Sequence, residues 1–332
     1  MKKISLQTIA DDFGVSKVTV HKALKNQPGV RPELKERIQS YASQIGYSTH
    51  DPIISKKHFL YIIDKKYFLS YEQFYTKIYY YLNNEIERNH GKITLLIYDG
   101  QPFYLSKIKE INGIDCILLA GETDDELMRL LGETDYPVIT IDFLSNRFPF
   151  DYIYINNYYS SMLATNYLIE QGHKKIGMVV DPLSANSNTD RFFGYQKALM
   201  LNSIPYHPEW LIDRNIEHYD IKDFDLPKEM PTAFICHCDK AAQQLYTKIK
   251  SETDLVIGED VSIISFDNTD LCESLTPKLT SVGLSLEKIA SIALKLAIYR
   301  LNNPDAEKVK RSLYPDITVR ESVKNLGSDE RE

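Results

Sequence analysis

Cysteine is scarce in this chain of 332 residues, and the sequence has no segment typical of a membrane protein. The four cysteines follow no disulfide framework. No apolar run approaches the roughly 20 residues that a membrane helix needs, and the amino-terminal segment has no apolar core of the kind that a signal peptide carries. These absences predict a cytoplasmic protein with no membrane partner. The cysteines are Cys116, Cys236, Cys238 and Cys272.

Catalytic motifs are also absent. The sequence contains no nucleophile elbow, phosphate loop or HExxH pattern, so we do not expect an enzyme. The segment CHCD at residues 236–239 combines thiol, imidazole and carboxylate groups, but adjacent residues rarely close a tetrahedral metal site without distant partners. We therefore expect neither a metal nor a cofactor.

Positive charge is scarce overall but concentrated at one end. The formal net charge is −7. Residues 1–50 hold eight Lys and Arg against four Asp and Glu, a net charge of +4, whereas the other 282 residues hold 31 against 42, a net charge of −11. Because an acidic body repels nucleic acid, we expect only the first fifty residues to contact a polyanion.

These fifty residues carry the pattern of a helix-turn-helix. Residues 6–13 place apolar side chains at helical spacing. Gly14 permits a tight turn, and Ser16 is a good N-cap for a second helix over residues 17–24. A third helix follows and ends at Gly46. The second helix of such a motif lies in the major groove, so the segment predicts DNA binding. A three-helix bundle with a solvated basic face is the alternative.

From residue 59 onward, apolar strands alternate with amphipathic helices. Strands without polar alternation, separated by helices, predict parallel sheets covered on both faces. Two such series predict an α/β body of two doubly wound parallel-sheet subdomains, with a ligand bound beyond the carboxyl ends of the strands, in the cleft between them. The strands are centred near residues 61, 95, 117 and 139 and then at 175–180, 231–236 and 261–266; the helices are expected at 71–89, 124–131, 160–170, 190–201 and 239–250.

Three charged side chains lie where ligand-binding groups are expected in such sheets. Asp142 ends the run PVITID, Asp267 follows the run VSIISF, and Arg191 is early in a predicted helix. A carboxylate accepts hydrogen bonds from sugar hydroxyls, and a guanidinium offers a planar fork of donors. A salt bridge between Arg191 and a carboxylate that closes the cleft is the alternative.

Ordered motifs over nearly the whole chain resemble the lactose/galactose repressor (LacI/GalR) family. The resemblance implies a helix-turn-helix head and a periplasmic-binding-protein-like body in a ligand-responsive repressor, with a carbohydrate as the effector. In the head the matching residues are Ala10, Gly14-Val15-Ser16, Thr19-Val20, Lys22-Ala23-Leu24 and Ile45-Gly46-Tyr47. In the body they are NYLIEQGHKKIGMVV (166–180), DRFFGYQKAL (190–199), CHCDKAAQQL (236–245), GEDVSIISFDNTDLCESLTPKLTSV (258–282) and LYPDITVRESV (313–323).

The resemblance implies that the second helix reads operator DNA. Lys17 and Val18 match base-reading positions, and Lys22 replaces a base-contacting Arg, which weakens bidentate recognition of guanine. One head covers one half-site, so a homodimer is expected. The candidate DNA-binding residues are Ser16, Lys17, Val18, Thr19, His21, Lys22 and Lys25.

The resemblance also implies effector contacts in the body. Arg191 and Asp267 match the family's main contacts, and Asp142 matches a frequent one. Cys238 replaces an effector-binding Asn and is a poor hydrogen-bond partner, so either the ligand lacks a polar group at this position or Asp239 serves in its place. An aromatic pair early in the first body helix either faces the pocket or packs in the core. The candidate effector-binding residues are Phe74, Tyr75, Asp142, Arg191, Cys238, Asp239 and Asp267.

We expect a helix-turn-helix domain at 1–50, a short linker or atypical hinge at 51–58, an effector-binding and dimerisation domain at 59–323 and a polar tail at 324–332. Within the larger domain, the subdomains are expected at about 59–156 plus 283–315 and about 157–282 plus 316–323. The linker lacks the small-residue–Arg–x–Leu pattern of the family's hinge helix, and Ile53 and Ile54 are its only evident apolar wedges. A plain linker and a shortened hinge remain alternatives.

A different functional class stays open beside the repressor. A sugar-binding protein of the periplasmic-binding fold, with weak or no specific DNA binding, would share the expected body.

Overall fold

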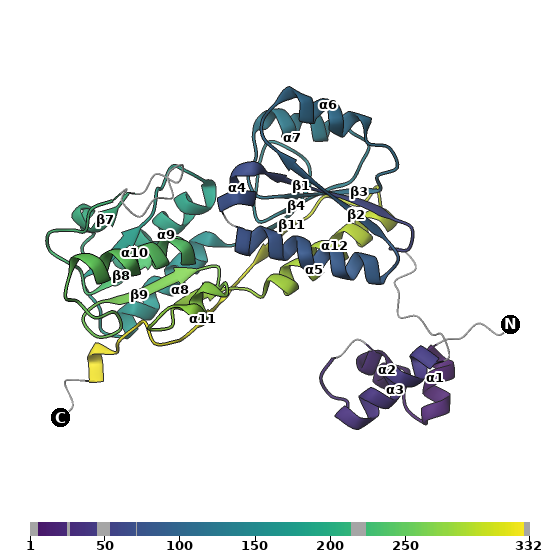
Figure 1. Ribbon diagram of the computed structural model, residues 1–332, viewed down its shortest axis with the longest axis horizontal. Helices are drawn as coiled ribbons and strands as arrows, with labels where there is room; N and C mark the ends of the chain where they lie inside the picture. Colours follow the sequence, from purple (N-terminus) through teal and green to yellow (C-terminus); the bar gives the residue numbers. More distant parts are fainter. Residues whose placement is uncertain (1–5, 25–26, 45–53, 71, 214–223, 329–332) are drawn as a thin grey trace. The chain divides into compact units, whose positions relative to one another are not determined.

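The computed structural model describes residues 6–24, 27–44, 54–70, 72–213 and 224–328 (Figure 1). The chain forms two compact units. One comprises residues 1–57 with 85–92, and the other comprises 58–84 with 93–332. No helix in the described part of the chain is both long and apolar enough to cross a membrane.

The head is a bundle of three helices, α1 (Leu6–Phe13), α2 (Lys17–Leu24) and α3 (Pro32–Gln44). Gly14 has a positive φ of 61°, and the amides of Gly14 and Val15 donate back to the carbonyls of Asp11 and Ala10. This pattern ends α1 with a left-handed cap that favours glycine. The core side chains are Ile9, Ala10, Val20, Ala23, Ile38 and Ala42.

The described part of the linker packs against residues 85–92, which belong to the same compact unit. Ile54 is 2% exposed, and it lies so close to Gly91 that a Cβ on that glycine would be 2.9 Å from its side chain. The amide of Lys56 donates to the carbonyl of His90, and the amide of Lys92 to that of Lys57. Ile54, one of the two candidate wedges, is therefore buried in this structure. Ile53 lies outside the described residues.

The body contains two six-stranded sheets. The first has the order β11 (Lys310–Leu313), β5 (Asp151–Ile155), β4 (Val138–Ile141), β3 (Cys116–Ala120), β1 (His58–Asp64) and β2 (Lys92–Tyr98). The second has the order β12 (Asp316–Thr318), β10 (Thr280–Gly283), β9 (Ser262–Phe266), β8 (Ala233–Cys236), β6 (Ile176–Val179) and β7 (Leu211–Ile212). Among the strand pairs whose register the described residues define, all are parallel except that of β12 with β10.

Helices cover both faces of each sheet. Around the first sheet, Figure 1 shows α6 (Pro102–Glu110) and α7 (Asp125–Gly132) on one face and α5 (Lys77–Arg88) and α12 (Leu286–Asn302) on the other. In the second, Ile235 of β8 packs in a cluster with α8 (Asn157–Glu170) and α9 (Asn186–Leu201), whereas Phe234 packs in a cluster with α10 (Asp239–Glu252). Successive side chains of one strand thus enter opposite cores, as expected for a doubly wound fold.

The smaller elements complete the body. They are α4 (Lys65–Ser70), a π-helical turn η1 (Glu72–Thr76), the 3₁₀ turns η2 (Pro208–Trp210) and η3 (Leu326–Ser328), and α11 (Leu271–Ser274). Each of the expected body strands is present. The helix expected over 71–89 is instead the turn η1 followed by α5, and the strand pattern left β5, β7, β10, β11 and β12 unassigned.

Candidate functional site

Two aspartates occupy equivalent positions in the two sheets. Asp142 follows β4 and Asp267 follows β9, and each strand is third in its sheet order. The amide of Asp142 donates to the carbonyl of Ile153 in β5 over 2.7 Å, and the amide of Asp267 donates to that of Val282 in β10 over 2.9 Å. Both therefore lie at the carboxyl edge of a parallel sheet, where ligands bind in open α/β folds.

Both aspartates have left-handed backbones. Their φ angles are 69° for Asp142 and 97° for Asp267. Such a conformation costs a non-glycine residue about 1–3 kcal/mol, and residues held in it cluster at functional sites.

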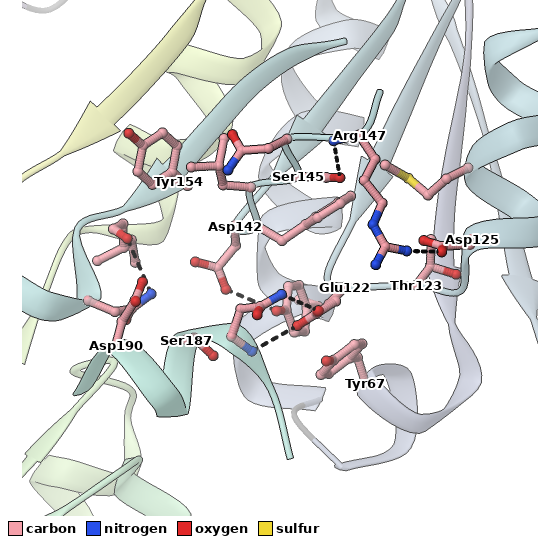
Figure 2. Close-up of a pocket in the computed structure, with 18 residues that line it drawn as sticks. Tyr67, Glu122, Thr123, Asp125, Asp142, Ser145, Arg147, Tyr154, Ser187 and Asp190 are labelled. Carbon is pink, nitrogen blue, oxygen red and sulfur yellow. Dashed lines mark hydrogen bonds and ion pairs between the residues drawn. The ribbon is translucent and has the colours of Figure 1, made fainter. Parts of the chain in front are cut away.

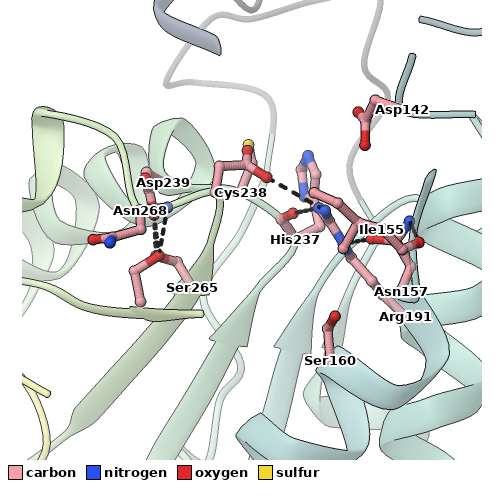
Figure 3. Close-up of polar contacts among 12 residues, drawn as sticks. Asp142, Ile155, Asn157, Ser160, Arg191, His237, Cys238, Asp239, Ser265 and Asn268 are labelled. Atoms are coloured by element: carbon pink, nitrogen blue, oxygen red, sulfur yellow. Dashed lines mark hydrogen bonds and ion pairs between the residues drawn. The ribbon is translucent and has the colours of Figure 1, made fainter. Parts of the chain in front are cut away.

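Arg191 lies within the second subdomain and is held by three groups there (Figure 3). Its Nη2 donates to Asp267 Oδ1 over 3.3 Å, its Nε donates to Asn157 Oδ1 over 2.9 Å, and its Nη1 donates to the carbonyl of His237. The guanidinium also lies 4.6 Å from the ring centroid of Phe266. The ion pair joins α9 to the end of β9 and so does not cross between subdomains. The salt bridge between Arg191 and a carboxylate that the alternative expected is therefore present, but it lies within the second subdomain and not across the cleft.

The first subdomain supplies an aromatic partner for its own aspartate. The Tyr75 hydroxyl donates to Asp142 Oδ2 over 2.9 Å. Burial raises the pKa of Asp142 to about 6, although this hydrogen bond and the charge of Arg191 act to lower it. Burial also raises the pKa of Asp267, against the lowering effect of Arg191. Both carboxylates are thus short of donors, which a ligand rich in hydroxyl groups would supply.

A cavity of about 540 Å³ opens beside these groups (Figure 2). Its volume lies within the range of small-molecule sites, roughly 300–1,000 Å³. Residues of the first subdomain make most of the lining, and α8 and α9 contribute the rest. The lining residues with acidic, basic or aromatic side chains are Tyr67, Tyr75, Glu122, Asp125, Asp142, Phe143, Arg147, Tyr154 and Asp190.

Five of the seven candidate effector residues fall into three groups in the structure. Tyr75 and Asp142 line the cavity. Arg191 and Asp267 do not line it, but Arg191 bonds to Asn157, which does. Phe74 is 5% exposed and does not line the cavity; its ring packs edge-on against Tyr75 with 5.0 Å between centroids.

Cys238 and Asp239 have structural roles in this conformation, which corrects the expectation for them. The Cys238 sulfur accepts a hydrogen bond from the amide of Ala241 over 3.4 Å and caps α10. Asp239 is 1% exposed. Its carboxylate accepts hydrogen bonds from Ser265, Ser281 and both the amide and the hydroxyl of Thr269. Figure 3 shows Asp239 beside Ser265. Four donors from its own chain leave Asp239 little capacity for an effector.

Several lining residues were missed from the sequence. Glu122 follows the carboxyl end of β3, as Asp142 follows that of β4, so the same strand-end rule applied to β3 would have found it. Asn157 lies two residues after β5, a strand whose pattern was not recognised. Arg147 lies in the loop between β4 and β5, and nothing local in its sequence marks it.

The head presents the outer face of α2 to solvent. Lys17, Val18 and His21 are exposed, and Val18 is 63% accessible although it is apolar. Ser16 caps α2, because its Oγ accepts from the amide of Thr19 over 3.1 Å. Thr19 and Lys22 are partly exposed. Lys25 lies outside the described residues.

No group of three or more His, Cys, Asp or Glu side chains in the described ranges is arranged to hold a metal ion.

Comparison with known proteins places this geometry in a family. A model described as a periplasmic binding protein-like domain matches residues 165–323. The transcriptional repressor PurR of Vibrio atlanticus is 30% identical over 237 residues, which cover 69% of this chain and 70% of the repressor. The PurR of Pasteurella multocida is 25% identical over 342 residues, which cover 97% and 99% of the two chains.

The fold itself is shared with solved structures. A LacI family transcriptional regulator from Enterococcus faecium, with bound ribose, superposes with a TM-score of 0.70 at 22% identity, covering 81% of this chain and all of that one. The named relatives are transcriptional repressors and not enzymes. With its three-helix head, two-sheet body and 30% identity over most of a repressor, this chain belongs to the LacI/GalR family of transcriptional regulators.

Proposed function

We propose that this chain is a ligand-responsive repressor that binds operator DNA through α2 as a homodimer and binds a carbohydrate in the cavity of its body. The observation that carries the ligand proposal is the pair Asp142 and Asp267, two donor-poor carboxylates at equivalent strand ends. The effector acts on DNA binding through a difference in its affinity for the DNA-competent and DNA-incompetent states.

The cavity chemistry supports a polyhydroxylated ligand. Asp142 can accept from neighbouring hydroxyl groups, and the Tyr67 and Tyr75 rings line the same space. Breaking the long 3.3 Å contact between Arg191 and Asp267 frees a donor fork and an acceptor for further hydroxyls. The related fold from Enterococcus faecium that holds ribose supports the same class.

The charge of the lining favours an uncharged ligand over an anion. Four carboxylates line the cavity, those of Glu122, Asp125, Asp142 and Asp190. Arg147 is the one Lys or Arg in that lining, and it is paired with Asp125. A phosphorylated sugar would meet a net negative potential, so we expect it to bind more weakly than the parent sugar.

Ligand binding is tested by thermal unfolding of the full-length protein against a panel of sugars and sugar phosphates, followed by calorimetry on each hit. A bound ligand at 100 times its Kd stabilises the folded state by about 2.7 kcal/mol. We expect the hit to lose at least tenfold in affinity in Arg191→Ala and in Asp267→Ala. Arg129→Ala, an exposed change on α7 outside the cavity lining, is the matched control. A hit unaffected by either variant would overturn the assignment of the pocket.

The DNA proposal is supported by the exposed face of α2. Lys17, Val18 and His21 point away from the head core and are available to contact base edges, as the N-terminal residues of a recognition helix do. The side chain of Lys22 extends toward the loop after α2, where a Cβ on Gly29 would lie 3.7 Å from its Nζ. A lysine can leave such a contact for a base or phosphate at little cost.

Operator binding is tested with duplexes that the full-length protein enriches from a random library. We expect Lys22→Ala to reduce binding of the enriched duplex to the level of a scrambled one, because a base contact contributes about 1–3 kcal/mol of discrimination. Lys35→Ala, on α3, removes the same charge from another helix and is the matched control. If no sequence is enriched while sugar binding persists, the chain is instead a sugar-binding protein without specific DNA recognition.

A further inference from the structure

A group of basic side chains lies at the amino edge of the first sheet, away from the edge where Asp142 follows β4. Residues 54–57 directly precede β1, and residues 85–92 run from the last turn of α5 to the start of β2. Because β1, β3 and β4 are parallel, the amino end of β1 and the carboxyl end of β4 lie at opposite edges of the sheet. We call these two segments the basic patch. None of their residues lines the cavity.

Backbone hydrogen bonds join the two segments of the basic patch. The amide of Lys56 donates to the carbonyl of His90 over 2.9 Å. The amide of Lys92 donates to the carbonyl of Lys57 over 2.8 Å. The side chain of Ile54 is buried, which anchors the first segment. The basic side chains therefore extend from a backbone that is fixed by hydrogen bonds and packing.

The basic patch is positively charged although the chain around it is acidic. Its two segments hold four Lys and Arg against two Glu, a net charge of +2. Residues 51–332 as a whole hold 31 against 42, a net charge of −11. A local excess of positive charge on an acidic protein attracts a polyanion at that place alone.

Three cations of the basic patch lack a carboxylate partner. Lys56, Arg88 and Lys92 are exposed, and none of them forms an ion pair with a carboxylate in the described part of the chain. The helix dipole favours Arg88 in the last turn of α5. No such effect applies to Lys56 and Lys92, which lie outside helices. Their charges are thus available to a ligand.

Two basic side chains of the patch occupy backbone positions that favour glycine. The φ angles are 68° for Lys56 and 60° for His90. Lys56 is the third residue of a turn that closes when the amide of Lys57 donates to the carbonyl of Ile54, and glycine or asparagine is usual there when φ is positive. His90 follows the end of α5, where glycine is again favoured. The turns themselves therefore do not explain the basic side chains.

Chain length keeps the basic patch within reach of DNA that the head binds. Ten residue steps separate Gln44, which ends α3, from Ile54, so these two residues lie at most about 36 Å apart. One turn of a DNA duplex is of the same length, about 34–36 Å. Because the duplex carries one negative charge per about 1.7 Å of its axis, many phosphates beside the site that the head reads are within this distance.

We propose that the basic patch is a second DNA-contacting surface, in which Lys56, Arg88 and Lys92 bind backbone phosphates beside the site that α2 reads. The inference rests on the proposed operator binding and extends the DNA contact from the first fifty residues to the body. Phosphate contacts position a protein on the duplex without reading its sequence. The patch therefore adds affinity and salt dependence, whereas α2 supplies the selectivity.

The test is binding of the full-length protein to fluorescent duplexes, one with the enriched sequence and one scrambled, over about 50 to 300 mM NaCl. The triple variant Lys56→Gln, Arg88→Gln and Lys92→Gln should bind both duplexes about tenfold more weakly or worse at the lowest salt, because three phosphate contacts are lost. The slope of log K against log[NaCl] should fall by about 2 or more, since each phosphate contact contributes about 0.9. The ratio of the two affinities should stay within about twofold of that of the parent protein.

The matched control makes the same change in net charge elsewhere on the body. It combines Lys174→Gln, Lys228→Gln and Lys295→Gln, three exposed lysines outside the basic patch. We expect this control to change neither affinity by more than about twofold, because distant charges are screened by salt. An equal loss in both triple variants would overturn the inference, since net charge alone would then explain it.

Lys56→Gly separates DNA contact from folding. Glycine adopts the positive φ without strain, so this variant should unfold at the same temperature as the parent protein or higher, while it binds both duplexes more weakly. A triple patch variant with the affinities and salt slope of the parent protein would overturn the second surface and leave operator binding by α2 intact. A parent protein that binds neither duplex would overturn the proposed DNA binding and this inference with it.

Discussion

At the scale of single residues, the Asp142 carboxylate is in an unfavourable environment in the ligand-free fold. Asp142 has a left-handed backbone, is partly buried and has a pKa raised to about 6. The ordinary value is about 3.9, so folding favours the protonated form. A hydroxyl-rich ligand that donates hydrogen bonds to the carboxylate stabilises its ionised form, and this stabilisation contributes to the free energy of ligand binding.

The raised pKa of Asp142 predicts how stability changes with pH. A carboxyl whose folded pKa lies above its unfolded pKa stabilises the fold below about pH 4, and this contribution is lost as pH rises to about 6. Asp142→Asn removes the ionisation, retains an acceptor for Tyr75 and tolerates the left-handed backbone. We therefore expect the variant to be more stable than the parent by about 1–3 kcal/mol at pH 7.5 and by little at pH 4. Urea unfolding of the ligand-free protein at both pH values measures this.

The control for this pH dependence is Asp254→Asn, an exposed carboxylate. This variant should show the same difference in the free energy of unfolding between pH 7.5 and pH 4 as the parent protein. If the free energy of unfolding changes with pH in the same way for Asp142→Asn and for the parent protein, the pKa of Asp142 is not raised by folding and the prediction is contradicted.

At the scale of elements, Asp239 joins the start of α10 to β9, β10 and the turn after β9. Its carboxylate accepts from side chains of Ser265 and Ser281, which lie on the two strands, and from Thr269 in the turn. The turn begins at Asp267. The buried carboxylate of Asp239 therefore anchors the turn that positions the ligand-site carboxylate of Asp267, although no hydrogen bond joins the two in the described structure.

Asp239→Asn should destabilise the second subdomain. The amide nitrogen would face hydroxyl and amide donors that now bond to a carboxylate oxygen, and a hydrogen bond to a charged group contributes about 1.5–3 kcal/mol. We expect a loss of about 2–4 kcal/mol in the free energy of unfolding, measured in urea at pH 7.5, against no change in Asp254→Asn. A loss below 0.5 kcal/mol would contradict the role assigned to this carboxylate.

Elements also differ in how far local sequence predicts them. The strand expected near residue 117 is β3, in which all five residues are buried. A continuous apolar run of this kind predicts a strand without any information about the strands beside it. By contrast β12, at Asp316–Thr318, pairs antiparallel at the sheet edge and has no fully buried residue. Its strand conformation comes from pairing with β10, so no local pattern marks it.

At the scale of the whole body, the described residues include two polar contacts between the side chains or helix ends of the two subdomains. Lys77 at the start of α5 forms an ion pair with Asp270 of the second subdomain. Glu122, after β3, accepts from the amide of Asn186 at the start of α9 over 3.1 Å and also from its side-chain nitrogen. A carboxylate at a helix N-terminus is favoured by the helix dipole. Both contacts hold the subdomains together around the cavity.

Loss of the ion pair should weaken ligand binding without any change to the cavity lining. Asp270 is absent from that lining, so Asp270→Asn removes no ligand contact and acts through the link between the two subdomains. An exposed pair contributes at most about 1 kcal/mol, and we expect the Kd of a bound sugar to rise two- to threefold at 50 mM NaCl. Salt screens such a pair, so the difference should vanish at 0.5 M NaCl. Calorimetry at both salt concentrations tests this, and a salt-independent difference would contradict it.

The sequence by itself determined the helix-turn-helix pattern, the alternation of strands and helices and the strand-end position of Asp142, because each depends on residues within a few positions along the chain. Tertiary structure decided which polar groups remain available. Asp239 was a candidate ligand contact until folding brought donors from β9 and β10 to its carboxylate. Arg147 gained a place at the mouth of the cavity because Asp125, 22 residues earlier, lies within reach of it. Contacts between residues distant in sequence fix burial and hydrogen bonding, and no local pattern encodes them.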